Sequence, residues 1–309
     1  MPTSSPRFAL PVRDGVGPSC VALPSQGTGN MLDFLVKRMP NVARAEWLQR
    51  MEAGDVVDEF GVPVGPGRVF EAGLRVYYYR SLAEEPALPF TETVLYQDEH
   101  LVVADKPHFM PVMPSGRYLH TTLLVRLKRQ LGLPELAPLH RIDRDTAGLV
   151  LLSAQQCTRG AYHALFHDRK ITKHYEAIAP WRADLAFPRE HASRLEEAPE
   201  FFRTHEVPGL PNSLSRIAVL EIAGAWARYR LSPVTGKRHQ LRVHMAALNM
   251  PLRNDPLYPV VNDVPDGDHS RPLQLLAKSL AFIDPLTGEP RVFESRQSLS
   301  LTAVCKDKD

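Results

Sequence analysis

The sequence has little cysteine. Three cysteines stand among 309 residues, at Cys20, Cys157 and Cys305, and an odd, scattered set of this kind argues against a disulfide framework. The sequence contains neither a CxxC pair nor a cluster of cysteine and histidine. It therefore does not indicate a zinc site.

Long hydrophobic runs are lacking as well. No segment approaches the roughly 18 apolar residues of a membrane-spanning helix, and the N-terminus does not show a charged segment followed by an apolar one. We therefore expect no membrane association and a cytoplasmic location. A Walker loop and a GxGxxG motif are also missing, which argues against the nucleotide-dependent classes of enzyme.

The excess of basic charge is small, since the formal net charge is +2 at pH 7, but its distribution is uneven. No Asp or Glu occurs from Ile222 to Asn254, whereas this stretch contains Arg228, Arg230, Lys237, Arg238, Arg242 and Arg253. A locally basic segment fits contacts with the phosphates of a polyanion. It fits a solvated cationic face equally well.

One turn carries the strongest chemical signal. Asp143 lies between Arg141 and Arg144, and the unbroken apolar stretch from Leu149 to Leu152 follows directly after Gly148. Neighbouring positive charge stabilises the ionised form of a carboxylate, and an apolar run of this kind predicts a buried element beneath the turn. The pattern predicts an active site here. An Asp that only caps the turn is the alternative.

The segment from His140 to Ser153 resembles the HRLDxxTSGLLLLA motif of the RluA-type pseudouridine synthases, with Ile142 in place of Leu and Ala147 in place of Ser. Four further segments resemble motifs of that family in the family's order. They are 101–107, a strand ending in Lys-Pro; 173–177, like KxYxA; 235–246, like TGRTHQLRVHMA; and 254–258, like GDPLYG.

The resemblance implies an α+β fold, with the pseudouridine synthase core of a mixed or antiparallel bent sheet and flanking helices. The implied activity is isomerisation of particular uridines in ribosomal or transfer RNA to pseudouridine, on a target base that leaves the helical stack. RNA is the implied partner, and nothing indicates an obligate protein partner. An isomerisation requires no redox cofactor, metal or energy source, so we expect no cofactor.

The resemblance also implies roles for individual residues. Asp143 corresponds to the family's catalytic residue, Arg242 to its ionic partner, and Tyr175 to the aromatic residue that packs on the target base. Whether Asp143 attacks the ribose, attacks the uracil ring or abstracts a proton stays open. From the residues alone, Tyr175 also fits a core tyrosine, and Arg242 a phosphate-binding surface. The side chains expected to bind RNA are Lys106, Arg141, Arg144, Lys173, Lys237, Arg238 and His239.

Two histidines of the fourth motif invite a metal interpretation. His239 and His244 are five residues apart, which places them about 140° apart on a helix and on opposite faces of a strand. A zinc-binding helix uses the spacing i and i+4 instead. We therefore expect no metal at this pair.

The chain is expected to fall into four parts. Residues 1–28, rich in Pro, Ser and Gly, indicate a flexible arm. Residues 29–80, two helices and then a small sheet, resemble the S4-like RNA-binding domain of a small-subunit ribosomal protein. Residues 81–91 indicate a linker, and 92–309 the catalytic domain. Between Met31 and Arg80, seven basic and seven acidic side chains cancel, so RNA binding and a packing or partner-binding role fit this small domain equally well.

A second class of function fits the same scaffold, namely a non-catalytic RNA-binding or ribosome-assembly factor. The presence of Asp143, Tyr175 and Arg242 together argues against it, because a chain that only binds RNA has no need of that carboxylate. Departures from the family pattern fall in the presumed loops. For example, 108–110 reads His-Phe-Met where Ala-Gly-Leu is usual, so these departures bear on which RNA fits.

Overall fold

The computed structural model describes residues 10–80, 84–200, 202–299 and 301, which divide into two compact units, 1–85 and 86–309. The division falls inside the segment expected to be a linker. Residues 1–9 of the expected arm and residues 81–83 of the expected linker lie outside the described residues. Within the described ranges, none of the helices combines the length and apolar character that crossing a bilayer requires.

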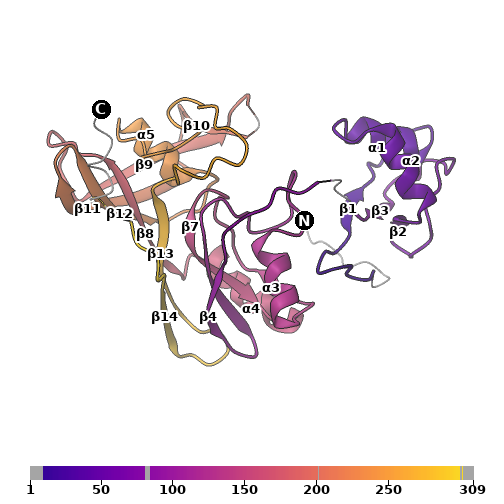
Figure 1. Ribbon diagram of the computed structural model, residues 1–309, viewed down its shortest axis with the longest axis horizontal. Helices are drawn as coiled ribbons and strands as arrows, with labels where there is room; N and C mark the ends of the chain where they lie inside the picture. Colours follow the sequence, from indigo (N-terminus) through magenta and orange to yellow (C-terminus); the bar gives the residue numbers. More distant parts are fainter. Residues whose placement is uncertain (1–9, 81–83, 201, 300, 302–309) are drawn as a thin grey trace. The chain divides into compact units, whose positions relative to one another are not determined.

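The smaller unit contains two helices and a three-stranded antiparallel sheet in the order β1-β3-β2 (Figure 1). Its elements are β1 (Ser19–Ala22), α1 (Met31–Arg38), α2 (Arg44–Glu52), β2 (Val56–Asp58) and β3 (Arg75–Tyr78). The prediction of a flexible arm up to residue 28 is wrong for residues 19–22, because they pair with β3 and close the sheet.

The recurrence of apolar residues after Met31 at i, i+3, i+4 and i+7 predicts an amphipathic helix, and α1 forms there. Asn30 caps α1 by accepting a hydrogen bond from the Asp33 amide, and Leu32 and Leu35 are buried with Trp47 of α2 in the core of this unit. The β-prone run 62–64 predicts a strand, but the structure has only an isolated bridge between Val57 and Pro63 there.

The larger unit is built on an eleven-stranded sheet whose main path runs β10-β9-β11-β12-β8-β13-β7-β5-β4, with β14 on β13 and β6 on β7 (Figure 1). Its strands are β4 (Thr93–Gln97), β5 (Leu101–Lys106), β6 (Ala137–Pro138), β7 (Ala147–Ser153), β8 (Thr172–Pro180), β9 (Arg189–Glu197), β10 (Thr204–Val207), β11 (Ser213–Ala223), β12 (Trp226–Pro233), β13 (Leu275–Ile283) and β14 (Pro290–Glu294). Its helices are α3 (Leu123–Leu131), α4 (Gln156–His167) and α5 (Gln240–Ala247). The pairs are antiparallel apart from β13 with β7, so the predicted mixed α+β sheet is confirmed.

The apolar run after the Asp143 turn is strand β7, and all seven of its residues are buried. Successive side chains of a strand point to opposite faces. Val150 and Leu152 therefore pack in the cluster that includes α3, whereas Leu149 and Leu151 pack in the cluster that includes α4. A strand covered on both faces needs a continuous apolar sequence, which explains the run.

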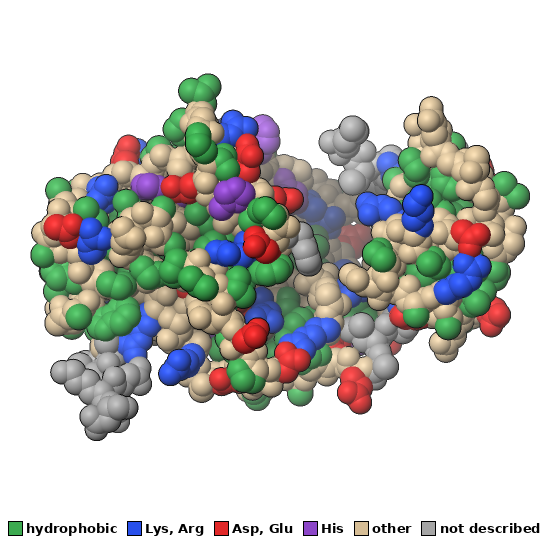
Figure 2. Space-filling model, turned by 90° about the horizontal axis from the view of Figure 1, so that it is seen from above, with side chains coloured by type: hydrophobic (Ala, Val, Ile, Leu, Met, Phe, Trp, Pro, Cys, Tyr) green, Lys and Arg blue, Asp and Glu red, His purple; other side chains and the backbone are tan. Residues whose placement is uncertain are grey.

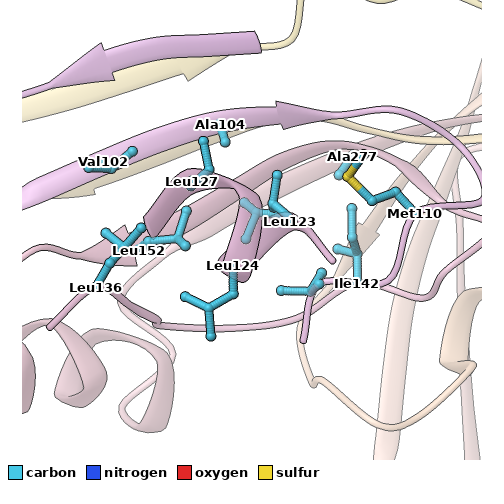
Figure 3. Close-up of a cluster of buried hydrophobic side chains, with 12 residues drawn as sticks. Val102, Ala104, Met110, Leu123, Leu124, Leu127, Leu136, Ile142, Leu152 and Ala277 are labelled. Atoms are coloured by element: carbon cyan, nitrogen blue, oxygen red, sulfur yellow. The ribbon is translucent and has the colours of Figure 1, made fainter. Parts of the chain in front are cut away.

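Figure 3 shows the cluster on the α3 face of β7. Leu123 and Leu127 of α3 pack there with Val102 of β5, and Ile142 lies at the end of the cluster with Met110. Ile142 is the residue immediately before Asp143, so its burial anchors the turn to the core.

Helix α5 packs over another part of the sheet. Leu241 and Met245 share a cluster with Ala227, Tyr229 and Leu231 of β12, the three residues that the alternating sequence predicts on one face of that strand. This packing fixes the orientation of α5.

Candidate active site

A cavity of about 870 Å³ lies where the Asp143 turn meets β8 and the segment leading into α5. Its lining includes residues 140–143, Lys173 and Tyr175 from β8, and much of the segment 233–242. A volume of this size falls within the range of ligand-binding pockets.

The four residues of the turn that line the cavity differ in how far they are anchored in the protein. The ring of His140 accepts a hydrogen bond at Nε2 from the Leu151 amide, 3.1 Å away, and Ile142 is buried. Arg141 is exposed, and the Asp143 side chain keeps 28% of its accessible surface. The turn therefore presents Asp143 on an anchored backbone.

The expected ion pair between Asp143 and Arg242 forms, with Arg242 Nη1 3.2 Å from Asp143 Oδ2. Arg242 comes from the first turn of α5 and is only 1% exposed. Its remaining donors, Nε and Nη2, bind the two carboxylate oxygens of Asp255 at 2.9 and 2.6 Å. One buried guanidinium thus joins two carboxylates, of which only Asp143 reaches the cavity.

Asp255 was not predicted as a site residue. Its only signal in the sequence is its place in the segment that resembles GDPLYG. Besides holding Arg242, its Oδ1 accepts hydrogen bonds from the amides of Leu257 and Tyr258. Burial acts to lower the pKa of Arg242, but the hydrogen bonds and charge of Asp255 outweigh it, and the pKa is raised. Arg242 therefore stays charged at every pH at which the protein is folded.

Tyr175 lies in β8 and lines the cavity. It packs against two core clusters, the one that includes α3 and the one that includes α5. Burial, followed by the negative charge of Asp143, raises the pKa of its phenol. At neutral pH the ring therefore carries a protonated hydroxyl and can offer a face to a base.

The residues predicted to bind RNA divide into groups. Arg141 and Lys237 are exposed side chains of the cavity, and Lys173 is a half-buried one. Arg238, the residue after Lys237, is also exposed. Arg144 instead pairs with Asp145 at 2.9 Å and faces a second cavity of about 880 Å³.

The prediction for Lys106 is wrong. This residue was predicted to contact RNA, but it is 0% exposed. Its Nζ donates to the backbone carbonyls of Pro107 and Arg144 at 2.9 and 3.0 Å. Every residue of β5 is buried, so the Lys106 side chain supports the backbone of the Asp143 turn from inside the protein, where RNA cannot reach it.

His239 and His244 lie in different environments. His239 lines the cavity, whereas the buried ring of His244 has both nitrogens hydrogen-bonded to serine hydroxyls at 2.9 to 3.1 Å. The group that could hold a metal ion is His244 with His191 and Glu206, whose ligand atoms lie within 4.8 Å of one another. The sequence did not indicate this group, because its three residues are far apart in the chain. Both nitrogens of the His244 ring already have hydrogen-bond partners in the serines.

On the face of the molecule drawn in Figure 2, basic and acidic side chains alternate across the larger unit without a continuous basic patch. Of the six basic residues between 222 and 254, Lys237 and Arg242 line the cavity, whereas Arg228 pairs with Glu176 and Glu221 and Arg253 lines the second cavity.

Comparison with known proteins gives a consistent result. A family model described as RNA pseudouridylate synthase matches residues 100–247. An uncharacterized RNA pseudouridine synthase of Synechocystis is 33% identical over 232 residues, which are 74% of this chain and 79% of that protein. The dual-specificity RNA pseudouridine synthase RluA of Haemophilus influenzae is 28% identical, and the match covers 68% of this chain and 95% of that protein.

Matches to longer proteins and to solved structures agree. The human pseudouridylate synthase RPUSD2 is 32% identical over 181 residues, but the chain spans only 32% of its length. The solved structure of human RNA pseudouridylate synthase domain containing 1 superposes with a TM-score of 0.55 at 22% identity, covering 72% of this chain and 96% of that one. At that identity the superposition speaks for the fold alone.

Proposed function

Since the chain belongs to the RNA pseudouridylate synthase family and is thus an isomerase that acts on RNA, we propose that Asp143 is its catalytic residue and that the adjoining cavity receives the target uridine. The observation that carries this proposal is the position of Asp143. It is the carboxylate that a buried, fully paired arginine holds at the wall of a nucleotide-sized cavity.

The reaction breaks the bond between ribose C1′ and uracil N1, turns the base and rejoins it through uracil C5. A carboxylate supports such chemistry as a nucleophile or as a base. Arg242 holds Asp143 in place and balances its negative charge, since Nη1 contacts one oxygen while Asp255 keeps the guanidinium from moving. The ring of Tyr175 supplies an aromatic face for an unstacked base.

The target nucleotide has to leave its helical stack to reach this cavity. Arg141, Lys173, Lys237 and Arg238 are suited to contact the displaced strand, because the affinity of proteins for RNA comes largely from basic side chains on phosphates. Arg144 would serve a phosphate farther from the target. We infer ribosomal or transfer RNA as the substrate and the cytoplasm as the place of reaction, and no step in this scheme calls for a cofactor.

The first experiment identifies the substrate. Pseudouridines are mapped in total RNA from cells with and without the gene, and a site lost in the second sample is rebuilt as a short RNA. The rebuilt RNA, labelled with tritium at uracil C5, releases tritium when the isomerase acts on it.

With this RNA, Asp143→Asn should reduce tritium release below detection. RNA affinity should stay within about twofold of wild type, because phosphate contacts dominate binding. Asp184→Asn, at an exposed aspartate paired with Arg182, is the matched control and should remain active. Activity that survives in Asp143→Asn would remove Asp143 from the proposed role.

A further inference from the structure

His239 is held in an unusual conformation at the wall of the active-site cavity. Its backbone φ is +53°, in the left-handed region, at the residue that precedes the first turn of α5. Residues other than glycine seldom adopt this conformation, and such residues concentrate at functional sites. Its side chain is only 9% exposed and points between Tyr258 and Asp143.

The hydrogen bonds around Tyr258 assign the proton of the His239 ring. The Tyr258 hydroxyl lies 2.8 Å from the Thr204 amide, which donates to it, and 2.9 Å from His239 Nδ1. A phenol carries a single hydrogen, and Tyr258 is only 4% exposed. Among the described residues, the arrangement that satisfies all three groups has the hydroxyl donate to Nδ1.

Nδ1 is therefore an acceptor, and a neutral His239 carries its hydrogen on Nε2. Burial lowers the pKa of His239 despite the opposing charge of Asp143, which favours the neutral ring. The Nε2–H group faces Asp143 Oδ1 at 3.8 Å, too far for a direct hydrogen bond. The other oxygen, Oδ2, is already bound by Arg242.

The Nε2–H donor of His239 and the Oδ1 acceptor of Asp143 thus flank a gap of 3.8 Å at the cavity wall. A group that bridges them has to accept one hydrogen bond from Nε2 and donate one to Oδ1. A carbonyl only accepts and an imide N–H only donates, whereas a hydroxyl does both. Within an RNA chain the 3′ and 5′ oxygens are esterified, so the 2′-hydroxyl is the sole hydroxyl group of a uridine.

We propose that His239 Nε2–H and Asp143 Oδ1 together bind the 2′-hydroxyl of the target ribose, and that His239 makes the site specific for RNA over DNA. The inference rests on the proposed function of Asp143. Its geometry is consistent with that function, because C2′ is bonded to C1′, the carbon at which the glycosidic bond breaks. The 2′-hydroxyl is also the group by which proteins distinguish the two nucleic acids.

The test compares two unreactive RNAs that differ at one atom. The mapped target site carries pseudouridine in one RNA and 2′-deoxypseudouridine in the other, and fluorescence anisotropy gives each dissociation constant. Wild type should bind the 2′-deoxy RNA about tenfold more weakly, as expected for the loss of hydrogen bonds to a charged group. His239→Ala should bind both RNAs with nearly equal affinity, and His239→Gln, which can again place an N–H near the gap, should recover part of the difference.

Two further variants complete the design. Tyr258→Phe removes the hydroxyl that fixes the ring proton, so it should reduce the difference while keeping the imidazole, and it serves as the test if His239→Ala does not fold. His163→Ala, an exposed histidine of α4, should behave as wild type. A merely structural His239 predicts the same ratio of affinities in wild type and in the His239 variants, and that result would overturn the inference.

Conversion of the unmodified RNA is measured in parallel. Normal conversion by wild type with an unchanged affinity ratio in His239→Ala rejects the role of His239 alone. Conversion that persists in Asp143→Asn rejects the proposed catalytic residue instead.

Discussion

Arg242 is the single residue on which the geometry of the site depends most. A buried charge is tolerated when it is paired and hydrogen-bonded, and Asp143 and Asp255 together meet this need at three nitrogens of the guanidinium. The two carboxylates differ in surroundings, since the Asp255 side chain is fully buried and that of Asp143 is 28% exposed. Asp255 thereby anchors the arginine, and Asp143 is left to face the cavity.

Asp255→Asn should lower both stability and turnover. It leaves the Arg242 cation partly uncompensated in the interior, which should lower the free energy of unfolding by about 3 kcal/mol in urea titrations. It should also lower kcat, because Arg242 is no longer fixed against Asp143. The control is Asp266→Asn, which breaks an exposed pair with Arg117 and should change stability by less than about 1 kcal/mol. Equal stability of the two variants would contradict this account.

Lys106 gives the protein a specific pH dependence of stability. Burial, opposed by the charges of Asp145 and Asp143, lowers the pKa of Lys106 from 10.5 to about 7. Above pH 7 the native state releases this proton, whereas the unfolded chain keeps it up to about pH 10.5. The unfolded state then binds more protons, so this residue makes stability rise with pH in that window.

The difference in unfolding free energy between wild type and Lys106→Met should therefore increase above pH 7, with a slope that approaches about 1.4 kcal/mol per pH unit between pH 8 and pH 9. Urea titrations at several pH values measure it. Lys170→Met, at an exposed lysine, is the matched control for replacing a lysine by methionine. A flat difference for Lys106→Met would show that its ammonium group titrates normally.

At the scale of elements, the start of β7 fixes how the Asp143 turn meets the sheet. Gly148 has φ +108° and pairs with Ala277 of β13, the strand that runs parallel to β7. A Cβ at this position would lie 2.3 Å from the Ala277 carbonyl oxygen. Glycine is required here for its conformation and also for the close approach of the two backbones.

Gly148→Ala should lower the free energy of unfolding by about 3 kcal/mol or more, because the backbone of β13 has to move and the residue is strained. Gly160→Ala is the matched control. Gly160 lies within α4, and a Cβ added there would have no neighbour within 4 Å. Alanine at this position should leave stability unchanged or raise it by up to about 1 kcal/mol. Thermal unfolding of both variants checks the contrast.

The sequence predicted the elements unevenly. Helical patterns in the sequence predict helices at 121–131, 158–167 and about 240–249. The structure has them at Leu123–Leu131, Gln156–His167 and Gln240–Ala247, since helical periodicity is a local property. Strands β9, β10, β13 and β14 were not identified. Strand β13 pairs with β7 and β8, which are far away in the sequence, and a local window does not contain that information. Strands β10 and β14 pair only with their neighbours β9 and β13 in the described sheet.

At the scale of the whole molecule, each unit carries its own hydrophobic core. The smaller unit is organised around Trp47, and the larger one around clusters on both faces of its sheet. Every residue placed in the candidate site belongs to residues 86–309. The larger unit therefore holds the whole of the candidate site.

A fragment of residues 86–309 should fold alone and isomerise its target with unchanged kcat. Circular dichroism should show a single cooperative unfolding transition, since the core of this unit is complete without residues 1–85. An increase in KM alone would assign RNA binding to the smaller unit, as its S4-like pattern suggests. A fragment that remains unfolded would show that the two units depend on each other for stability.

The sequence by itself determined the family motifs, the α+β class and the central helices, and it predicted Asp143, Tyr175 and Arg242 as site residues. These are properties of residue type and local order, which a linear string preserves. The tertiary structure alone decided that Asp255 anchors Arg242, that Lys106 is buried beneath the turn, and that His239 faces Asp143 with a defined proton. Each depends on contacts between segments far apart in the chain, where burial and hydrogen-bond partners are set by how the strands pair and how α5 packs on them.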